Sequence, residues 1–229
     1  MTEGRLIVAI DGPSGTGKSS VSKEVARRLE VGYLDTGAMY RAVAWWCQHQ
    51  GIDLGDQAAV ARAAETIPLV MGTHPDDPRV SVDGIAIDQQ IRTSEISEVV
   101  SAVATNLAVR ATMKKQQRQL INQIAEATGG VVAEGRDITT VVAPFADARI
   151  LMTASEEVRM GRRSKELAID SEATRAQIVE RDAKDSTVAQ FLTAADGVVT
   201  VDTSDLDFEQ SVEAVLGAIE ASTSAIAGR

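Results

Sequence analysis

The sequence predicts an α/β protein with a central parallel β-sheet and helices on both faces. Short aliphatic segments alternate along the chain with segments of helical periodicity, as in repeated β-α units. Aromatic residues make up only 3% of the chain and hydrophobic residues 44%, so the core must be mainly aliphatic, which suits buried parallel strands. A glycine-rich loop directly after the first aliphatic segment is the third indication. A chain of 229 residues is long enough for one large domain that carries an insertion.

Five aliphatic segments are expected to form the buried strands. They are residues 5–10, 31–34, 131–133, 149–152 and 198–201. Ligands of parallel sheets bind beyond the carboxyl ends of the strands. We therefore expect the residues that follow these strands to lie at one edge of the sheet, namely Asp11, Asp35, Glu134 to Asp137 and Thr153.

Helices are expected between the strands. The first covers about 17–29, with Val21, Val25, Ala26 and Leu29 on one face. Thr36 is a candidate N-cap for the second, which carries Tyr40. The later helices are expected at about 95–127, 155–167, 171–184 and 208–219, with a frayed tail from about Ser222.

One segment does not fit the β-α pattern. Residues 80–87 alternate apolar and polar side chains around Asp83-Gly84, which predicts an antiparallel hairpin. We interpret residues 53–97 as a small inserted subdomain of a single domain, whose core covers about 1–52 and 98–222. The charge-rich region 155–187 is a candidate lid.

Composition argues against several classes of protein. The formal net charge is -10, whereas nucleic-acid and anionic-membrane binders have a basic face. No apolar stretch approaches the length of a membrane span, and the run from Leu6 to Ile10 is too short for a signal peptide. Cys47 is the only cysteine, so an intrachain disulfide is excluded. We expect a cytoplasmic protein, with a monomer as the default.

The strongest motif is Gly12-xxxx-Gly17-Lys18-Ser19, which matches the P-loop pattern between a strand and a helix. Its backbone N–H groups and the helix dipole form a phosphate site. Lys18 should contact the terminal phosphates of a nucleoside triphosphate, and the Ser19 hydroxyl should ligate Mg²⁺. The expected nucleotide-binding residues are Gly12, Pro13, Ser14, Gly15, Thr16, Gly17, Lys18, Ser19 and Ser20.

A GTPase switch is disfavoured, because no Asn-Lys pair is present to bind guanine and Glu134 to Asp137 lacks the order Asp-x-x-Gly. A motor or transport ATPase stays open.

Four further polar clusters each have an ordinary structural interpretation beside a functional one. Thr36, Tyr40 and Arg41 begin a helix, which favours an anion but also fits a capped helix with a solvated Arg. Arg136 and Asp137 form a site or a local ion pair. The third cluster, Arg159, Arg162 and Arg163, is typical of a lid that closes over phosphates or of a solvated helix face. The fourth, Arg181 and Asp185, is typical of a surface salt bridge.

Taken together, these clusters resemble the bacterial cytidylate kinase family, within the nucleoside monophosphate kinases. The resemblance rests on Ile10 to Ser19, Leu34 to Arg41, Ile91 to Thr93, Glu134 to Asp137, and Glu180 to Asp182 with Asp185. They span nearly the whole chain in the family's order.

The resemblance implies transfer of the γ-phosphoryl group of MgATP to CMP or dCMP, which gives CDP or dCDP and ADP. It also implies that Arg41 and Arg136 hold the acceptor phosphate, that Ser101, Arg110 and Asp137 bind the cytosine edge, and that Thr36 and Tyr40 lie near the acceptor. Arg181 and Asp185 would contact the ribose, while Lys18, Arg159 and Arg163 would act in catalysis, the two arginines from the lid. The segment 80–87 would belong to an enlarged monophosphate-binding subdomain.

The chain departs from the family pattern after Asp185. Val188 stands where the family commonly has Arg, and Gln190-Phe191-Leu192 replaces the usual Ala-Pro-Leu. Two alternatives stay open at this point: a small P-loop kinase for a sugar acid, shikimate or another nucleotide, and a nucleotide-dependent switch that phosphorylates no small molecule.

Overall fold

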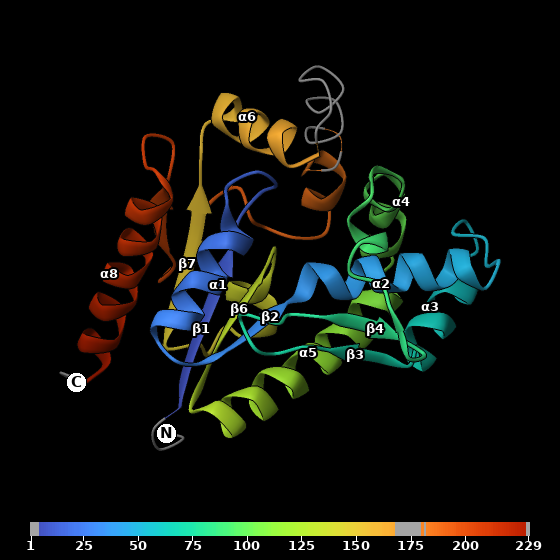
Figure 1. Ribbon diagram of the computed structural model, residues 1–229, viewed down its shortest axis with the longest axis horizontal. Coiled ribbons are helices and arrows are strands. Elements are labelled where there is room, and N and C mark those ends of the chain that lie inside the picture. The colour runs from blue at the N-terminus through green and yellow to red at the C-terminus, as the bar shows by residue number, and fades with distance from the viewer. Residues whose placement is uncertain (1–4, 168–179, 181, 228–229) are drawn as a thin grey trace.

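A computed structural model of the chain describes residues 5–167, 180 and 182–227. Figure 1 shows a central sheet flanked by helices, with α8 (Phe208–Ala227) along one side of the molecule. The small antiparallel strands and helices α2 (Thr36–His49), α3 (Gln57–Thr66) and α4 (Ser94–Ala104) gather on the opposite side. This arrangement agrees with the predicted α/β class.

The central sheet is parallel throughout, as predicted. Its strands are β1 (Leu6–Asp11), β2 (Gly32–Asp35), β6 (Gly130–Gly135), β7 (Ala148–Thr153) and β8 (Val199–Asp202), in the order β2-β6-β1-β7-β8. β1 lies at the centre because it pairs with β6 on one side and β7 on the other. Asp11, Asp35 and Thr153 end their strands, so the expected edge of polar residues is present.

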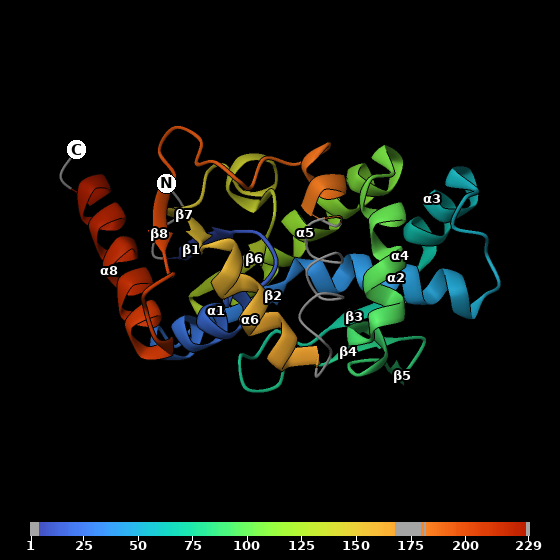
Figure 2. The ribbon, with the colours of Figure 1, turned by 90° about the horizontal axis from the view of Figure 1, so that it is seen from above.

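Two apolar clusters cover the two faces of this sheet. Val8 and Ile10 of β1 belong to the cluster that includes residues of α1 (Lys18–Arg28) and α8, whereas Ala9 belongs to the cluster shared with α2 and α5 (Leu107–Thr128). The alternation along β1 follows from the two-residue period of a strand. Figure 2 shows α6 (Glu156–Leu167) crossing above the beginning of α1, at the carboxyl ends of the strands.

The predicted hairpin is confirmed. β4 (Val80–Val82) pairs with β5 (Ile85–Ala86) in antiparallel fashion, and β3 (Leu69–Met71) adds a third strand. The two turn residues, Asp83 and Gly84, have φ values of 51° and 75°. Positive φ at both positions is the geometry of the turn that suits two-residue hairpins, and Asp-Gly favours it. Helix α3, strand β3 and the 3₁₀ turn η1 (Gln90–Arg92) were not predicted.

The long helix expected over 95–127 is wrong, because two helices occupy this region. α4 ends at Ala104, and α5 begins at Leu107. Asn106 is the N-cap of α5, and its side chain accepts hydrogen bonds from the N–H groups of Ala108 and Val109. An Asn that satisfies free N–H groups favours a new helix start over continuation of the old one. Arg110, in the first turn of α5, donates to the Ala104 carbonyl at the end of α4 and pairs with Asp137 beyond the end of β6.

The frayed tail expected from Ser222 is also wrong, since α8 continues to Ala227. The Ser222 and Thr223 hydroxyls donate to the carbonyls of Ala218 and Ile219, one turn earlier. The predicted helix at 171–184 lies largely outside the described residues; Glu180 and Asp182 to Lys184 are helical. A π-helical turn, η2 (Ile138–Val142), follows β6. Across the described chain, no helix is long and apolar enough to cross a membrane.

Candidate active site

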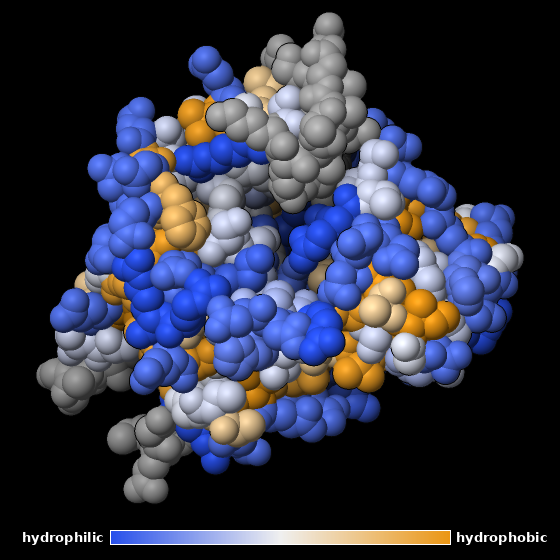
Figure 3. All heavy atoms as spheres, in the orientation of Figure 1, coloured by the Kyte–Doolittle hydropathy of each residue, from blue (hydrophilic) through white to orange (hydrophobic). Residues whose placement is uncertain are grey.

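A cavity of about 550 Å³ opens at the carboxyl ends of β1, β2 and β6. Its wall includes residues 14–20, the beginning of α2, Arg110 from α5, residues 134–137 and Asp185. In Figure 3, a hollow lined largely by hydrophilic residues is visible near the middle of the face shown. The cavity therefore brings together most of the residue clusters that the sequence singled out.

The P-loop forms one wall of the cavity. Gly15 and Gly17 have φ values of 82° and 84°, which glycine adopts without steric cost. A Cβ atom at Gly12 would overlap the Met152 carbonyl oxygen, so the loop can lie against β7 only with glycine there. The Thr16 hydroxyl donates to the Pro13 carbonyl at 3.1 Å, which holds the turn closed. The glycines and this hydrogen bond together give the loop its curled shape.

Lys18, in the first turn of α1, points at a buried carboxylate. Its Nζ atom lies 3.1 Å from Glu134 Oε2, and only 2% of the Glu134 side chain is exposed. Tyr33 donates a hydrogen bond to Glu134 Oε1 at 2.8 Å. Burial raises the pKa of Glu134, but Lys18 and the hydroxyls of Ser19 and Tyr33 outweigh burial, and the pKa is lower than usual. Glu134 is therefore ionised beside the phosphate loop.

Asp11 connects the start of the P-loop to the segment after β6. Its carboxylate accepts hydrogen bonds from the N–H groups of Ile138 and Thr139 at 2.9 and 2.8 Å, and from the Thr139 hydroxyl at 2.6 Å. Burial raises the pKa of Asp11 to about 6, although these hydrogen bonds act to lower it. Asp11 therefore fixes the position of the turn that carries Arg136 and Asp137.

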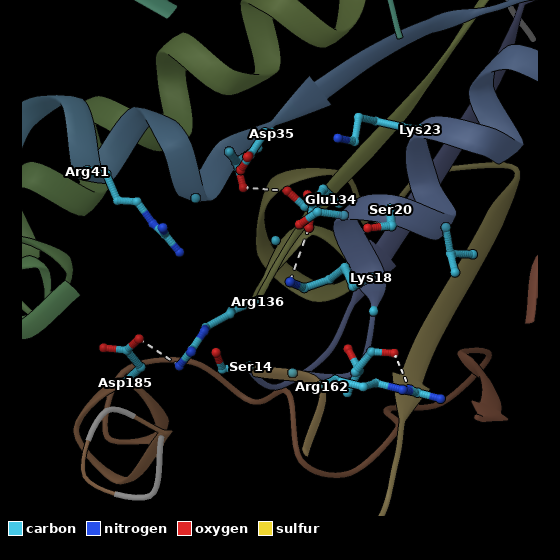
Figure 4. A pocket seen from close by; sticks show the side chains of 18 of the residues that line it. Ser14, Lys18, Ser20, Lys23, Asp35, Arg41, Glu134, Arg136, Arg162 and Asp185 are labelled. Atoms are coloured by element: carbon cyan, nitrogen blue, oxygen red, sulfur yellow. Dashed lines mark hydrogen bonds and ion pairs between the residues drawn. The ribbon is translucent and has the colours of Figure 1, made fainter. Parts of the chain in front are cut away.

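Arg136 extends from the end of β6 into the cavity, where carboxylates hold it. Its Nη2 atom lies 2.9 Å from Asp182, and its Nη1 atom lies 2.6 Å from Asp185. Figure 4 shows the Arg136 side chain turned toward Asp185, while Arg41 points into the same space from α2. The local ion pair of Arg136 with Asp137, one of the two alternatives considered from the sequence, is not formed, because each of them pairs with a residue distant in sequence.

Asp137 pairs with Arg110 of α5, at 2.5 Å between Oδ2 and Nη2. Burial raises the pKa of Asp137, while Arg110 and Lys114 oppose that rise. Ser101 of α4 donates to Asp185 Oδ1 at 3.0 Å. Residues predicted to bind one nucleotide thus come from two helices, a strand end and the segment that follows residue 181.

The beginning of α2 supplies Thr36, Tyr40 and Arg41. The N-cap is Asp35, whose carboxylate accepts from the Ala38 N–H at 2.8 Å, and not Thr36 as expected. The Thr36 hydroxyl instead donates to the Glu134 carbonyl at 2.7 Å. Burial, with the nearby charge of Asp137, raises the pKa of the Tyr40 hydroxyl, which is therefore neutral at pH 7.

The arginines of α6 differ in their contacts. Arg159 Nη1 donates to the Ser14 carbonyl at 3.0 Å and to Asp182 Oδ2 at 2.6 Å. Arg162 donates to the Thr16 carbonyl at 3.0 Å and to Thr203. The solvated helix face considered from the sequence is therefore wrong for Arg159 and Arg162. The Arg163 side chain and Arg181 lie outside the described residues.

Comparison with known proteins decides the family. The family model for cytidylate kinase matches residues 8–221. A cytidylate kinase of Streptomyces avermitilis is 48% identical over 217 residues, which cover 94% of this chain and 93% of the relative. A cytidylate kinase of Rhodococcus jostii is 42% identical, over 98% of this chain and 99% of the relative.

The chain belongs to the cytidylate kinase family. A gluconokinase from Sinorhizobium meliloti resembles it in structure with a TM-score of 0.50 and 13% sequence identity, over 97% of this chain and 96% of that one. An uncharacterised protein from Eubacterium ventriosum has a TM-score of 0.52 at 11% identity, over 95% and 99%. At these identities the likeness concerns the fold alone.

Several cavity residues of this cytidylate kinase family member were not predicted. Arg92, whose Nη2 atom lies 3.6 Å from Asp35 Oδ2, lines the cavity, as do Val100 and Ala104 of α4. Residues 206–208 and Ser211 line it near α8, far along the chain from the P-loop. For Arg92 the sequence offered a signal, because Ile91 to Thr93 is part of the resemblance, although no role was assigned to it. For the rest, only the fold brings them to the cavity.

Proposed function

We propose that the chain transfers the γ-phosphoryl group of ATP to CMP or dCMP, which gives ADP and CDP or dCDP. The observation that carries this proposal is that one cavity combines a phosphate loop with cations from other elements. The P-loop with Lys18 forms one wall, and Arg41 and Arg136 extend into the same cavity from α2 and from the end of β6. Membership of the cytidylate kinase family supports the choice of substrates.

At the donor end, the P-loop from Gly12 to Ser20 surrounds the phosphates of ATP with backbone N–H groups. The N-terminus of α1 adds the positive end of its dipole. Lys18 leaves Glu134 or shares its charge with the β- and γ-phosphates. Because Glu134 stays ionised, its charge keeps Lys18 oriented until the nucleotide binds.

The donor end also suits Mg²⁺. The metal prefers oxygen ligands and binds to proteins through few of them, together with substrate phosphates and waters. The Ser19 hydroxyl is the proposed direct ligand, and the partly buried Asp35 and the buried Glu134 carboxylates line the same cavity. When bound, Mg²⁺ neutralises charge on the phosphates and orients them.

At the acceptor end, Arg41 and Arg136 hold the phosphate of the monophosphate. Ser101, Arg110 and Asp137 bind the cytosine edge. The fit is chemical: cytosine presents an amino group as donor beside ring and carbonyl acceptors, and the Asp137–Arg110 pair offers a carboxylate beside a guanidinium. Asp185, and Arg181 outside the described residues, bind the ribose, with Thr36 and Tyr40 beside the acceptor.

Phosphoryl transfer requires the attacking and leaving oxygens in line and the charge of the moving group neutralised. Lys18 and the lid arginines Arg159 and Arg163 supply positive charge at the γ-phosphate. We propose that residues 155–187 act as the lid and residues 53–97 as the monophosphate-binding subdomain. Their closure removes water, which prevents transfer of the phosphoryl group to water.

The test is an ADP-release assay with ATP and a panel of acceptors: CMP, dCMP, UMP, AMP, shikimate and gluconate. We expect release that depends on CMP or dCMP and is at least about 100-fold faster than release without an acceptor. Preference for shikimate or gluconate would replace the proposal with a different small-molecule kinase. ATP binding without stimulation by any acceptor would favour a nucleotide-dependent switch.

A further inference from the structure

Phe191 is buried in an unusual place. None of its side chain is exposed, and it is among the largest fully buried side chains in the described chain. It belongs to neither of the two apolar clusters that the described residues form around the central sheet. Its ring instead lies against a charged group, because the Cζ atom of Arg136 lies over the ring, 4.6 Å from its centroid.

The contacts of Arg136 fall into two kinds. Asp182 and Asp185 form ion pairs with the guanidinium, 2.9 Å from Nη2 and 2.6 Å from Nη1, and Nη1 has no hydrogen-bond partner among the described residues. Phe191 has no hydrogen-bond acceptor and attracts the cation through the negative face of its ring. The carboxylates therefore occupy the space beside the two nitrogens that a phosphate would take, whereas the ring does not compete for it.

From this difference we propose that Phe191 is a positioning residue for Arg136, and that it holds the guanidinium in place for the phosphate of the acceptor nucleotide. The inference rests on the proposed role of Arg136 in binding that phosphate. When the phosphate takes the place of Asp182 and Asp185 beside these nitrogens, the ring contact stays intact. It keeps the arginine directed into the cavity in both the free and the loaded enzyme.

The position of Phe191 in the chain supports this role. Phe191 follows Asp185 by six residues, so one short segment supplies both a carboxylate and an aromatic ring to the same guanidinium. The segment also contains Val188, which cannot contribute a charge to the acceptor site. A chain without a cation at that position depends more strongly on the orientation of Arg136.

The effect should appear in acceptor affinity. A cation over a desolvated aromatic ring binds with a strength that corresponds to roughly 3- to 30-fold in an equilibrium constant. We expect Phe191→Leu, which keeps an apolar side chain of similar size, to raise the KM and the Kd for CMP by about that factor. The KM for ATP should change less than about 2-fold.

Site-specific fluorination of the ring separates attraction from packing. Fluorine atoms withdraw electron density from the ring face and weaken cation binding with little change in shape. The series is Phe191 replaced by 4-fluoro-, 3,5-difluoro- and 3,4,5-trifluorophenylalanine in the full chain. The control is the same series at Phe145, which is 54% exposed and does not line the cavity.

The measurements are Kd for CMP by calorimetry, the KM values for CMP and ATP, and the thermal midpoint. A stepwise rise of Kd and KM for CMP with each fluorine at position 191, and none at 145, supports the proposal. An unchanged Kd across the 191 series overturns it, even if Phe191→Leu binds CMP weakly, because packing would then explain that loss. A wild-type chain that neither binds nor phosphorylates CMP overturns the proposed function, and this inference with it, before any variant is made.

Discussion

Replacing Lys18 separates a catalytic role from a structural one. Lys18→Met keeps the length of the side chain but removes its charge from the phosphate loop. Loss of a charge contact to the transition state costs at least about 100-fold in turnover. We therefore expect kcat to fall by that factor or more in the ADP-release assay, at saturating ATP and CMP.

The same change should also destabilise the fold, because Lys18 is the counter-charge of Glu134. Only 2% of the Glu134 side chain is exposed, against 15% for Lys18. Breaking a buried ion pair by removal of one partner costs about 3–5 kcal/mol. Tyr33 still donates to Glu134 in the variant. We therefore expect a loss near the lower end, about 3 kcal/mol in unfolding free energy, measured by urea titration.

A double variant distinguishes the two effects. Glu134→Gln removes the stranded charge and keeps a carbonyl oxygen to accept from Tyr33. Lys18→Met with Glu134→Gln should therefore recover most of the lost stability but none of the lost turnover. Glu134→Gln alone is the control for the loss of the carboxylate. If the double variant regains turnover together with stability, Lys18 acts only through the fold, and the catalytic argument is refuted.

Three further perturbations test the rest of the site. Asp137→Ala should raise the KM for CMP at least about 10-fold while the Kd for ATP changes little, because Asp137 is proposed to bind the cytosine edge beside Arg110. An equal loss of affinity for both nucleotides would count against base recognition. Burial raises the pKa of Asp11 to about 6 from 3.8, so the contribution of Asp11 to stability is full below pH 3.8 and is lost as the pH rises through 6. Relative to Asp11→Asn, the unfolding free energy of the wild-type chain should fall by about 3 kcal/mol over that range. If urea titrations of the two chains differ by the same amount at every pH, the assignment is contradicted. Gly135→Ala should lower the unfolding free energy by about 1–3 kcal/mol, because a Cβ atom there would overlap the Thr36 hydroxyl. Gly161→Ala, with open space around it, should not lower the unfolding free energy. Equal thermal midpoints for the two variants would refute this prediction.

The P-loop was predictable from the sequence because its parts are contiguous. Gly12 to Ser19 form a loop whose shape depends on local backbone freedom and on the strand and helix at its two ends. The hairpin at 80–87 was predictable for the same reason, since Asp83-Gly84 determines the turn. Local chemistry is visible in a sequence, and these elements depend on little else.

The partners of the polar residues were not predictable. The pattern placed Arg136 next to Asp137, yet the structure pairs Asp137 with Arg110, which is 27 residues away. Arg136 pairs with Asp182 and Asp185, which reach it only because the chain returns to the cavity after β7. Asn106 broke a helix that periodicity alone extends, because its capping hydrogen bonds outweigh the propensity of its neighbours. Long-range pairing is decided by tertiary structure, whereas this helix break is decided by a local cap that the hydrophobic periodicity does not register.

This difference between the two halves of the site bears on where substitutions can be tolerated. In the donor loop, Gly12 contacts the β7 backbone and Gly15 contacts the backbone of α6, so neither position accepts a side chain without displacing main chain. On the acceptor side, Arg136 is held by an ion pair to Asp185 and by the ring of Phe191, two contacts of different physical kinds from one segment. A guanidinium that is held by an ion pair and by an aromatic ring can keep its position when another residue of that segment is replaced. Val188, which stands where the family pattern commonly has Arg, is such a replacement. Substitutions elsewhere in residues 182–192 should therefore be tolerated better than substitutions at Gly12 or Gly15.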